Sequence, residues 1–261
     1  MLDLIPTVTT SFVTAMAANS MKGAKGPAQA LDDIMSLVGF EKLHFYAEKK
    51  RAENEVYIKD YKEKIAQELV KIPEENIQEP PLSIVGPALE ASKFYIEEEE
   101  LRNMFAKLIA ASMDKSKENI VHNSYVEIIK QMSPLDAKIL SYINNNNFNN
   151  RYPICKVLIQ SNNLSGSKVL KSLFLVMPNF DNDLANAASI SNLKRLGLID
   201  ISFDTWLTND SLYETIENSD VGLFLKTSYL REDELLTHHV KFQRGIIEIN
   251  PYGENFIETC L

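Results

Sequence analysis

The sequence predicts a mainly α-helical protein with a small β component, in which a helical N-terminal domain precedes an α+β domain. Apolar residues recur at three- and four-residue spacing through most of residues 27–145, as on one face of a helix. Short runs typical of strands appear only after residue 150. The chain has 261 residues, of which 45% are hydrophobic, enough for two modest cores. The predicted parts are an N-terminal segment (1–26), a helical domain (27–132) and an α+β domain (133–261).

The composition limits the partners and the compartment that we expect. A net charge of −9 disfavours a molecule whose whole surface lies on nucleic acid or an anionic membrane. The two cysteines, Cys155 and Cys260, are too few and too distant for a disulfide scaffold, which indicates the cytoplasm. No apolar run is long enough to predict a transmembrane span. In residues 1–26, Asp3 and Pro6 are unlike an export signal, so we expect a flexible or interfacial segment.

A long charged helix is predicted for residues 40–72, which contain no glycine or proline. Its apolar stripe is narrow. The stripe consists of Leu43, Tyr57, Ile58, Tyr61, Ile65 and Leu69. Such a helix either lies on the surface of the fold or serves as an interaction arm. A homodimer formed through residues 40–72 therefore remains an alternative.

Four consecutive glutamates, Glu97–Glu100, precede an apolar helical face at residues 101–113. In the first turn of a helix, free N–H groups and the helix dipole favour negative charge. Side chains on adjacent helical residues diverge, and no histidine or cysteine stands beside them to complete a metal site. The glutamates therefore indicate a helix start. A short helix is predicted before them, beginning near Pro87.

Three further signals mark helix boundaries in the middle of the chain. Asn123 is predicted to cap the helix that follows it. Ser133, Pro134 and Asp136 form a second start signal. The asparagine-rich stretch 144–150 ends that helix.

The C-terminal third alternates between strand and helix signals. Residues 151–160 are predicted as an edge strand, because Pro153 cannot donate a ladder hydrogen bond. A helix capped by Asp181 and ended by Gly197 leads into a strand at 198–201. The chain is completed by a strand at Ile246–Ile249, a turn at Asn250-Pro251 and a helix from Gly253.

This order of elements resembles a winged helix domain. The resemblance implies that the helix before Leu196-Gly197-Leu198 acts in recognition, with Lys194 and Arg195 as candidate contacts. Residues 151–261 hold 10 lysines and arginines against 14 aspartates and glutamates, a net charge of −4, which favours a structural or protein-contact role over DNA binding. Trp206, the single tryptophan, stands in a polar loop. It marks a contact site if it is exposed and anchors the loop if it is buried.

No catalytic, cofactor or metal motif is evident, and we expect none of these functions. The four histidines are scattered, and no Cys-x-x-Cys or glycine-rich phosphate loop occurs. Arg231 and His238, with six residues between them, resemble the arginine and histidine pair that HEPN ribonucleases carry on a helix. They are weak nuclease candidates.

Residues 72–140 resemble the Abi-alpha (abortive infection alpha) family. The resemblance rests on IPEENIQEPPLSIVGPALEA, EELRNMFAKLIAASMD and VHNSYVEIIKQMSPLDAKIL, and NLKRLGLI and IEINPYGENF agree with the family's looser C-terminal part. It implies a bacterial, phage or mobile-element protein associated with abortive infection, in which an infected cell stops growing or dies before phage spread. No catalytic residue can be carried over from the family. His122, just before Asn123, either helps to cap the helix that follows or is an exposed contact.

These observations together predict a non-enzymatic component of phage defence that acts through macromolecular contacts. A protein partner is expected, through residues 49–61 or the loop around Trp206. The alternatives are a winged-helix DNA-binding regulator and a HEPN-like ribonuclease.

Overall fold

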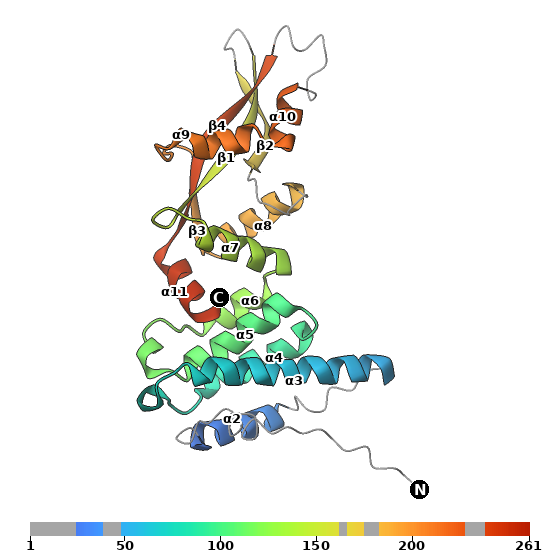
Figure 1. The fold of residues 1–261 in the computed structure, drawn as a ribbon, viewed down its shortest axis with the longest axis vertical. Helices are drawn as coiled ribbons and strands as arrows, with labels where there is room; N and C mark the ends of the chain where they lie inside the picture. Colours follow the sequence, from blue (N-terminus) through green and yellow to red (C-terminus); the bar gives the residue numbers. More distant parts are fainter. Residues whose placement is uncertain (1–24, 39–47, 162–165, 175–182, 228–237) are drawn as a thin grey trace. The chain divides into compact units, whose positions relative to one another are not determined.

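The computed structural model describes residues 25–38, 48–161, 166–174, 183–227 and 238–261. These residues are mainly helical with one small sheet, so the predicted fold class is confirmed (Figure 1). They divide into two compact units. Unit 1 comprises the described residues up to Pro134 together with 255–261, and unit 2 comprises those of 135–254. No helix among the described residues is both long and apolar enough to cross a membrane. The predicted N-terminal segment lies almost wholly outside the described residues.

Unit 1 is built around helix α5 (Glu99–Ser112), which contacts three other helices. These are α3 (Glu48–Val70), α4 (Leu82–Ser92) and α6 (Ser124–Lys130), and α2 (Lys25–Leu37) in turn contacts α4. The predicted apolar face of α5 is fully buried. Glu99 and Glu100 occupy its first turn, and Glu98 stands at its N-cap, as the helix-start interpretation requires. Single 3-10 turns lie at Glu74–Asn76, Lys93–Tyr95 and Lys115–Lys117.

The long charged helix is present as α3, with two distinct halves. Its C-terminal half is a core element, because Tyr61, Ile65 and Leu69 are completely buried. Just before this half, Glu55, Val56 and Lys59 are exposed, with Val56 at 65% of its full exposure. Residues 40–47 of the predicted helix lie outside the described residues. The helix is therefore solvent-facing over part of its length only, and the homodimer seam stays a prediction.

A nearly buried arginine joins α3 to α5. Arg102 of α5 donates from Nε to Asp60 Oδ2 at 3.0 Å, and its Nη2 lies 2.9 Å from the same oxygen. Its Nη1 donates to the Ile96 carbonyl at 2.5 Å. The guanidinium also lies over the Tyr57 ring, 5.2 Å from the ring centroid. Every side of the charged group thus has a partner, as a buried charge requires.

Helix α4 begins at Leu82, five residues before the predicted start at Pro87. Pro81 stands at its N-cap with φ −67° and ψ 115°. The proline at the start of the helix is therefore Pro81 and not the predicted Pro87. Pro87 lies inside the helix. Its missing N–H removes one helical hydrogen bond, a cost that the helix offsets by burying Val85, Ala88 and Leu89.

The cap of α6 also differs from the prediction. The Asn123 side chain makes no capping hydrogen bond. Instead the Ser124 N–H donates to Nδ1 of His122 at 3.1 Å, and the Ser124 hydroxyl lies 2.6 Å from the same atom. The Asn123 cap was therefore wrong, and the imidazole of His122 takes over its role.

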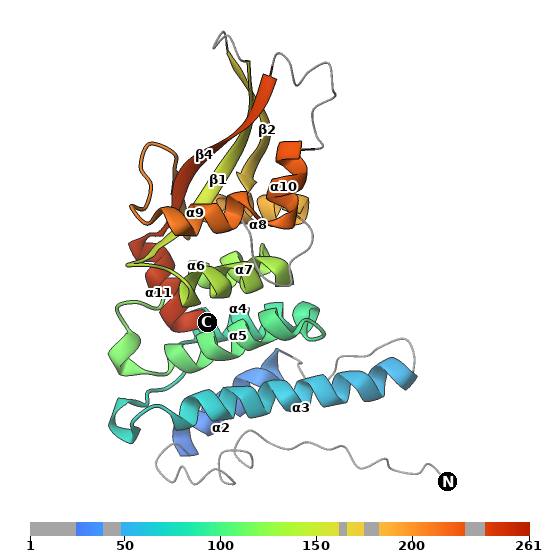
Figure 2. The same ribbon diagram turned by 45° about the horizontal axis from the view of Figure 1, so that its top comes forward.

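Unit 2 contains a four-stranded antiparallel sheet in the order β2-β1-β4-β3. The strands are β1 (Arg151–Ser161), β2 (Ser167–Phe174), β3 (Ile199–Ser202) and β4 (His238–Ile249). Helix α7 (Pro134–Asn145) precedes the sheet, and α8 (Asp183–Arg195), α9 (Asp210–Glu217) and α10 (Asp220–Thr227) lie between strands in the sequence. Helix α11 (Pro251–Cys260) follows β4. Both ribbon views show β1, β2 and β4 extending well past α9 (Figures 1 and 2).

The edge-strand prediction for residues 151–160 is wrong, because β1 lies between β2 and β4. The β2 register runs only from Cys155 to Gln160, so Pro153 lies beyond the end of β2 and pairs only with Ile246 of β4. The missing N–H is therefore tolerated in a central strand. Strand β4 begins at His238, eight residues before the predicted start at Ile246.

Two boundaries near the ends of unit 2 follow from local chemistry. Gly197 ends α8 with φ +76°, as predicted, whereas the predicted cap Asp181 lies outside the described residues. Helix α11 starts at Pro251 rather than at Gly253. The Gly253 N–H donates to Asn250 Oδ1 at 2.9 Å, so Asn250 is the cap and proline takes the favoured first position.

Helices α9 and α10 cover one face of β1 and β4. Cys155 and Val157 of β1 form a buried cluster with Tyr213, Ile216 and Leu225. The Tyr213 hydroxyl donates to the Gly245 carbonyl at 2.9 Å and accepts the Leu207 N–H at 3.0 Å. One phenol thus holds β4 and the loop before α9 together.

We expect Asp60→Asn to lower the free energy of unfolding by about 2 kcal/mol, because it leaves the nearly buried Arg102 cation without a counter-ion. Urea unfolding followed by circular dichroism measures the change. Lys59→Met is the matched control on the same helix. It removes an exposed pair with Glu63 at 3.8 Å and is expected to change stability by less than about 0.5 kcal/mol. Equal effects of the two substitutions would contradict the assigned role of Arg102.

Tyr213→Phe is expected to destabilise unit 2 by about 1–3 kcal/mol, because it removes the hydrogen bonds of the Tyr213 hydroxyl to the buried Gly245 carbonyl and the part-buried Leu207 N–H. Amide hydrogen exchange of β4 and α9 reports this loss locally. Thr215→Val serves as the control, since its exposed hydroxyl bonds only the Ser211 carbonyl on the same helix. Faster exchange in the control than in Tyr213→Phe would refute the prediction.

Candidate functional site

The residues singled out in the sequence do not form one site. Lys194 and Arg195 are exposed in the last turn of α8, where Arg195 donates to Asn192 Oδ1 at 3.0 and 2.8 Å. Trp206, at 59% exposure, lies in the loop between β3 and α9. His122 belongs to unit 1, whereas the other three belong to unit 2.

The nuclease candidates are not placed as a helical pair. Arg231 lies outside the described residues, and His238 is the first residue of β4. A strand residue does not share the helix that this type of active site uses.

The sheet of unit 2 has a second face, opposite to α9 and α10. Side chains alternate along a strand, so Lys156, Leu158 and Gln160 point away from the buried Cys155 and Val157. Their partners on β4 point the same way, since directly paired residues share a face. These six residues are Lys156, Leu158 and Gln160 with Gln243, Lys241 and His239, and we refer to them as the polar face.

The strand segments that carry the polar face hold positive charge, and the one acidic residue of these strands, Glu248, lies near the end of β4 beyond the polar face. No aspartate or glutamate occurs in β1, in β2 or in β4 up to Ile247, although the chain as a whole carries −9. The same strand segments contain six lysines and arginines, namely Arg151, Lys156, Lys168, Lys171, Lys241 and Arg244. The acidic character of the protein is therefore not spread evenly.

These cations differ in how far they are neutralised. Arg244 pairs with Asp210 and, at 3.3 Å, with Glu217, both on α9. Lys156 and Lys241 of the polar face form no ion pair with any described residue, and Lys241 is exposed. Among the described residues, Lys156 and Lys241 thus leave positive charge on the polar face, whereas Arg244 beneath α9 is neutralised.

Aromatic residues border the polar face. The Lys156 ammonium lies 4.1 Å from the centroid of the Phe203 ring. A Cβ atom at Gly245 would meet the Phe203 ring and the Ser202 carbonyl at 2.5 Å, so only glycine lets this ring lie across β4. Trp206 follows Phe203 by three residues, which limits its backbone to within about 10 Å.

Sequence reasoning missed the polar face because it began the last strand at Ile246. The stretch HHVKFQRG, residues 238–245, does alternate and contains no acid, which was the available signal.

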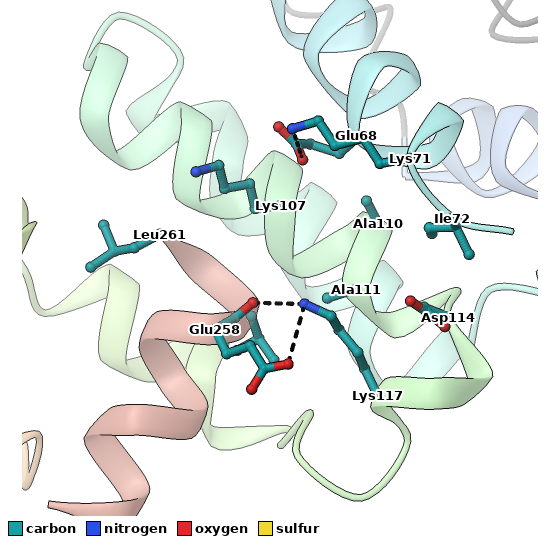
Figure 3. A pocket seen from close by; sticks show the side chains of 11 residues that line it. Glu68, Lys71, Ile72, Lys107, Ala110, Ala111, Asp114, Lys117, Glu258 and Leu261 are labelled. Atoms are coloured by element: carbon teal, nitrogen blue, oxygen red, sulfur yellow. Dashed lines mark hydrogen bonds and ion pairs between the residues drawn. The ribbon is translucent and has the colours of Figure 1, made fainter. Parts of the chain in front are cut away.

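Unit 1 contains a pocket of about 240 Å³ between the end of α3, the second half of α5, residues 114–117 and the end of α11 (Figure 3). Ile72, Ala110 and Ala111 form an apolar wall. Lysine side chains and carboxylates surround it. The sequence offered no signal for this pocket, because residues 255–261 reach unit 1 from the far end of the chain.

Neither cysteine is a reactive thiol. Burial raises the pKa of Cys155 and of Cys260 to about 12, so both stay protonated at neutral pH. Their role in the described structure is to fill the two cores. Over the described ranges, no group of histidine, cysteine and acidic side chains is arranged to hold a metal ion.

The comparisons with known proteins agree with the resemblance noted in the sequence. The family model described as "Abortive infection alpha" matches residues 53–260. No curated protein and no solved structure matches the chain. Because the family match covers well over half of the chain, this protein belongs to the abortive infection alpha family.

Proposed function

We propose that this protein is a non-enzymatic component of abortive infection that binds single-stranded nucleic acid on the polar face of unit 2. Family membership supports the association with abortive infection. The observation that carries binding to nucleic acid is that β1, β2 and β4 up to Ile247 contain no acidic residue, and that Lys156 and Lys241 form no ion pair with a described residue, in a protein of net charge −9.

The chemistry of the polar face suits a phosphodiester backbone. Lysines that neutralise phosphates release condensed counterions, which is a main source of affinity for nucleic acids. Gln160, Gln243 and His239 lie between the lysines and offer hydrogen-bond donors of the kind that contact phosphate, sugar or base edges. A protein face that carried carboxylates would repel the phosphates of a nucleic acid. For binding at the polar face, the local absence of carboxylates therefore matters more than the net charge of the whole protein.

The width of the sheet favours a single strand over a duplex. The major groove of DNA, about 12 Å wide, admits a helix or a two-stranded ribbon. Here β2, β1 and β4 lie side by side, and at about 4.8 Å between strands their backbones alone span about 10 Å before side chains are added. Single strands lie across such sheet faces and stack bases on aromatic side chains. The exposed Trp206, in the loop that follows Phe203, offers an indole ring for such stacking.

The double substitution Lys156→Glu/Lys241→Glu is expected to weaken binding of a labelled single-stranded oligonucleotide at least about tenfold. Fluorescence anisotropy over a series of salt concentrations should also show a smaller salt dependence, by about two units of slope. DNA and RNA oligonucleotides are tested separately. Phage plaque counts on cells that express each variant show whether defence falls with binding.

Lys194→Glu/Arg195→Glu is the matched control, with the same change in charge on the candidate recognition helix. It should retain binding. Loss of binding in this control and not in the sheet variant would favour the winged-helix regulator instead. A wild-type protein that co-purifies with a protein partner and binds no oligonucleotide would overturn the proposal.

Trp206→Ala is expected to weaken single-strand binding by about 5- to 100-fold, the range for loss of one base–aromatic stack. Its salt dependence should not change, because no charge is removed. Trp206→Phe should recover most of the affinity. If Trp206→Ala binds like the wild type, stacking by this residue is ruled out.

A further inference from the structure

The pocket of unit 1 contains one cation that its own walls do not neutralise. Lys71 is paired with Glu68 at 2.6 Å. Lys117 donates to the Glu258 carbonyl at 2.8 Å and lies 3.8 Å from its carboxylate (Figure 3). Lys107 has no hydrogen bond or ion pair with any described residue.

Lys107 is also partly withdrawn from water. Its side chain is half-buried on α5, and burial lowers the pKa of its ammonium group, an effect that the Glu68 carboxylate opposes. A cation that has lost part of its hydration without gaining a counter-ion is unfavourable. An anion bound in the pocket would supply the missing partner.

The surroundings restrict the charge of that anion to one. Asp114 is an acidic residue of the pocket lining, and its Oδ1 accepts hydrogen bonds from the Ser116 N–H at 2.9 Å and from the Ser116 hydroxyl at 2.6 Å. Glu68 and Glu258 add two more acidic groups. Ala110 and Ala111 belong to the last turn of α5, where the helix dipole is negative. A phosphate dianion would meet repulsion from all of these groups.

The size and the apolar wall define the rest of the ligand. Ile72, Ala110 and Ala111 are hydrophobic and nearly buried, so they match an aliphatic chain. A volume of about 240 Å³ holds roughly eight non-hydrogen atoms, since a water molecule occupies about 30 Å³ in the liquid.

We propose that this pocket binds a short-chain aliphatic monocarboxylate, with the carboxylate on Lys107 and the hydrocarbon against Ile72 and the two alanines. The ligand would contact α3, α5 and the end of α11 together. Occupancy would therefore stabilise the packing of residues 255–261 in unit 1. This site is separate from the polar face, and its test does not involve nucleic acid.

Hexanoate is the probe, because its six carbons, one of them in the carboxylate, and its two oxygens make roughly eight non-hydrogen atoms, which matches the pocket volume. Isothermal titration with the full chain is expected to show one saturable site. The comparison ligands are hexanol, which lacks the charge, and inorganic phosphate, which lacks the chain and carries more charge. Both should bind at least about tenfold more weakly.

Lys107→Met is expected to weaken hexanoate binding by about 10- to 100-fold, the range for one hydrogen bond to a charged group. Lys107→Arg should retain most of the affinity, and Lys115→Met, an exposed lysine outside the pocket, should retain all of it. Without ligand, Lys107→Met should raise the thermal midpoint, because it removes a poorly solvated charge, which distinguishes a lost site from a misfolded protein.

Three results would overturn the proposal. The first is no saturable binding of hexanoate to the wild-type protein. The second is binding of phosphate or hexanol as tight as that of hexanoate. The third is equal loss of affinity in Lys107→Met and Lys115→Met.

Discussion

The pairing of β1 with β4 over eleven residues is the constraint on which unit 2 depends. It joins segments about 90 residues apart in the sequence and fixes which side chains share a face. A shift of one residue would turn Cys155 and Val157 out of the core and place Lys156 beneath α9. The buried cluster around Tyr213 and the uncompensated lysines on the other face are thus two consequences of one register.

Local signals predicted most helices, because caps and apolar periodicity act over a few residues. The first turn of α5 and the end of α8 at Gly197 follow from such signals alone. One of the failures required knowledge of a distant segment, and another was a local choice. Pro153 indicated an edge strand, yet β1 is central because β2 ends before reaching it. His122 rather than Asn123 caps α6, a choice between neighbours that residue preferences do not decide.

Net charge does not describe how charge is distributed over the sheet, for the same reason. Carboxylates of α9 neutralise Arg244, whereas no carboxylate on the described strands reaches Lys156 or Lys241. The strand register therefore places neighbouring basic residues of the sequence on opposite faces of the sheet, where their surroundings differ in charge. The pocket of unit 1 was invisible in the sequence because its walls come from α3, α5 and the last residues of the chain. In both cases the sequence holds the groups, and only the fold brings them together.

Ultraviolet cross-linking of the full chain to single-stranded oligonucleotides, followed by peptide mapping, tests the central claim most directly. It reports which residues touch the nucleic acid, without any substitution. The account predicts cross-links in β1, in β4 and in the loop that carries Trp206. Cross-links confined to α8 or to unit 1, or none above those of an unrelated acidic protein, would contradict it.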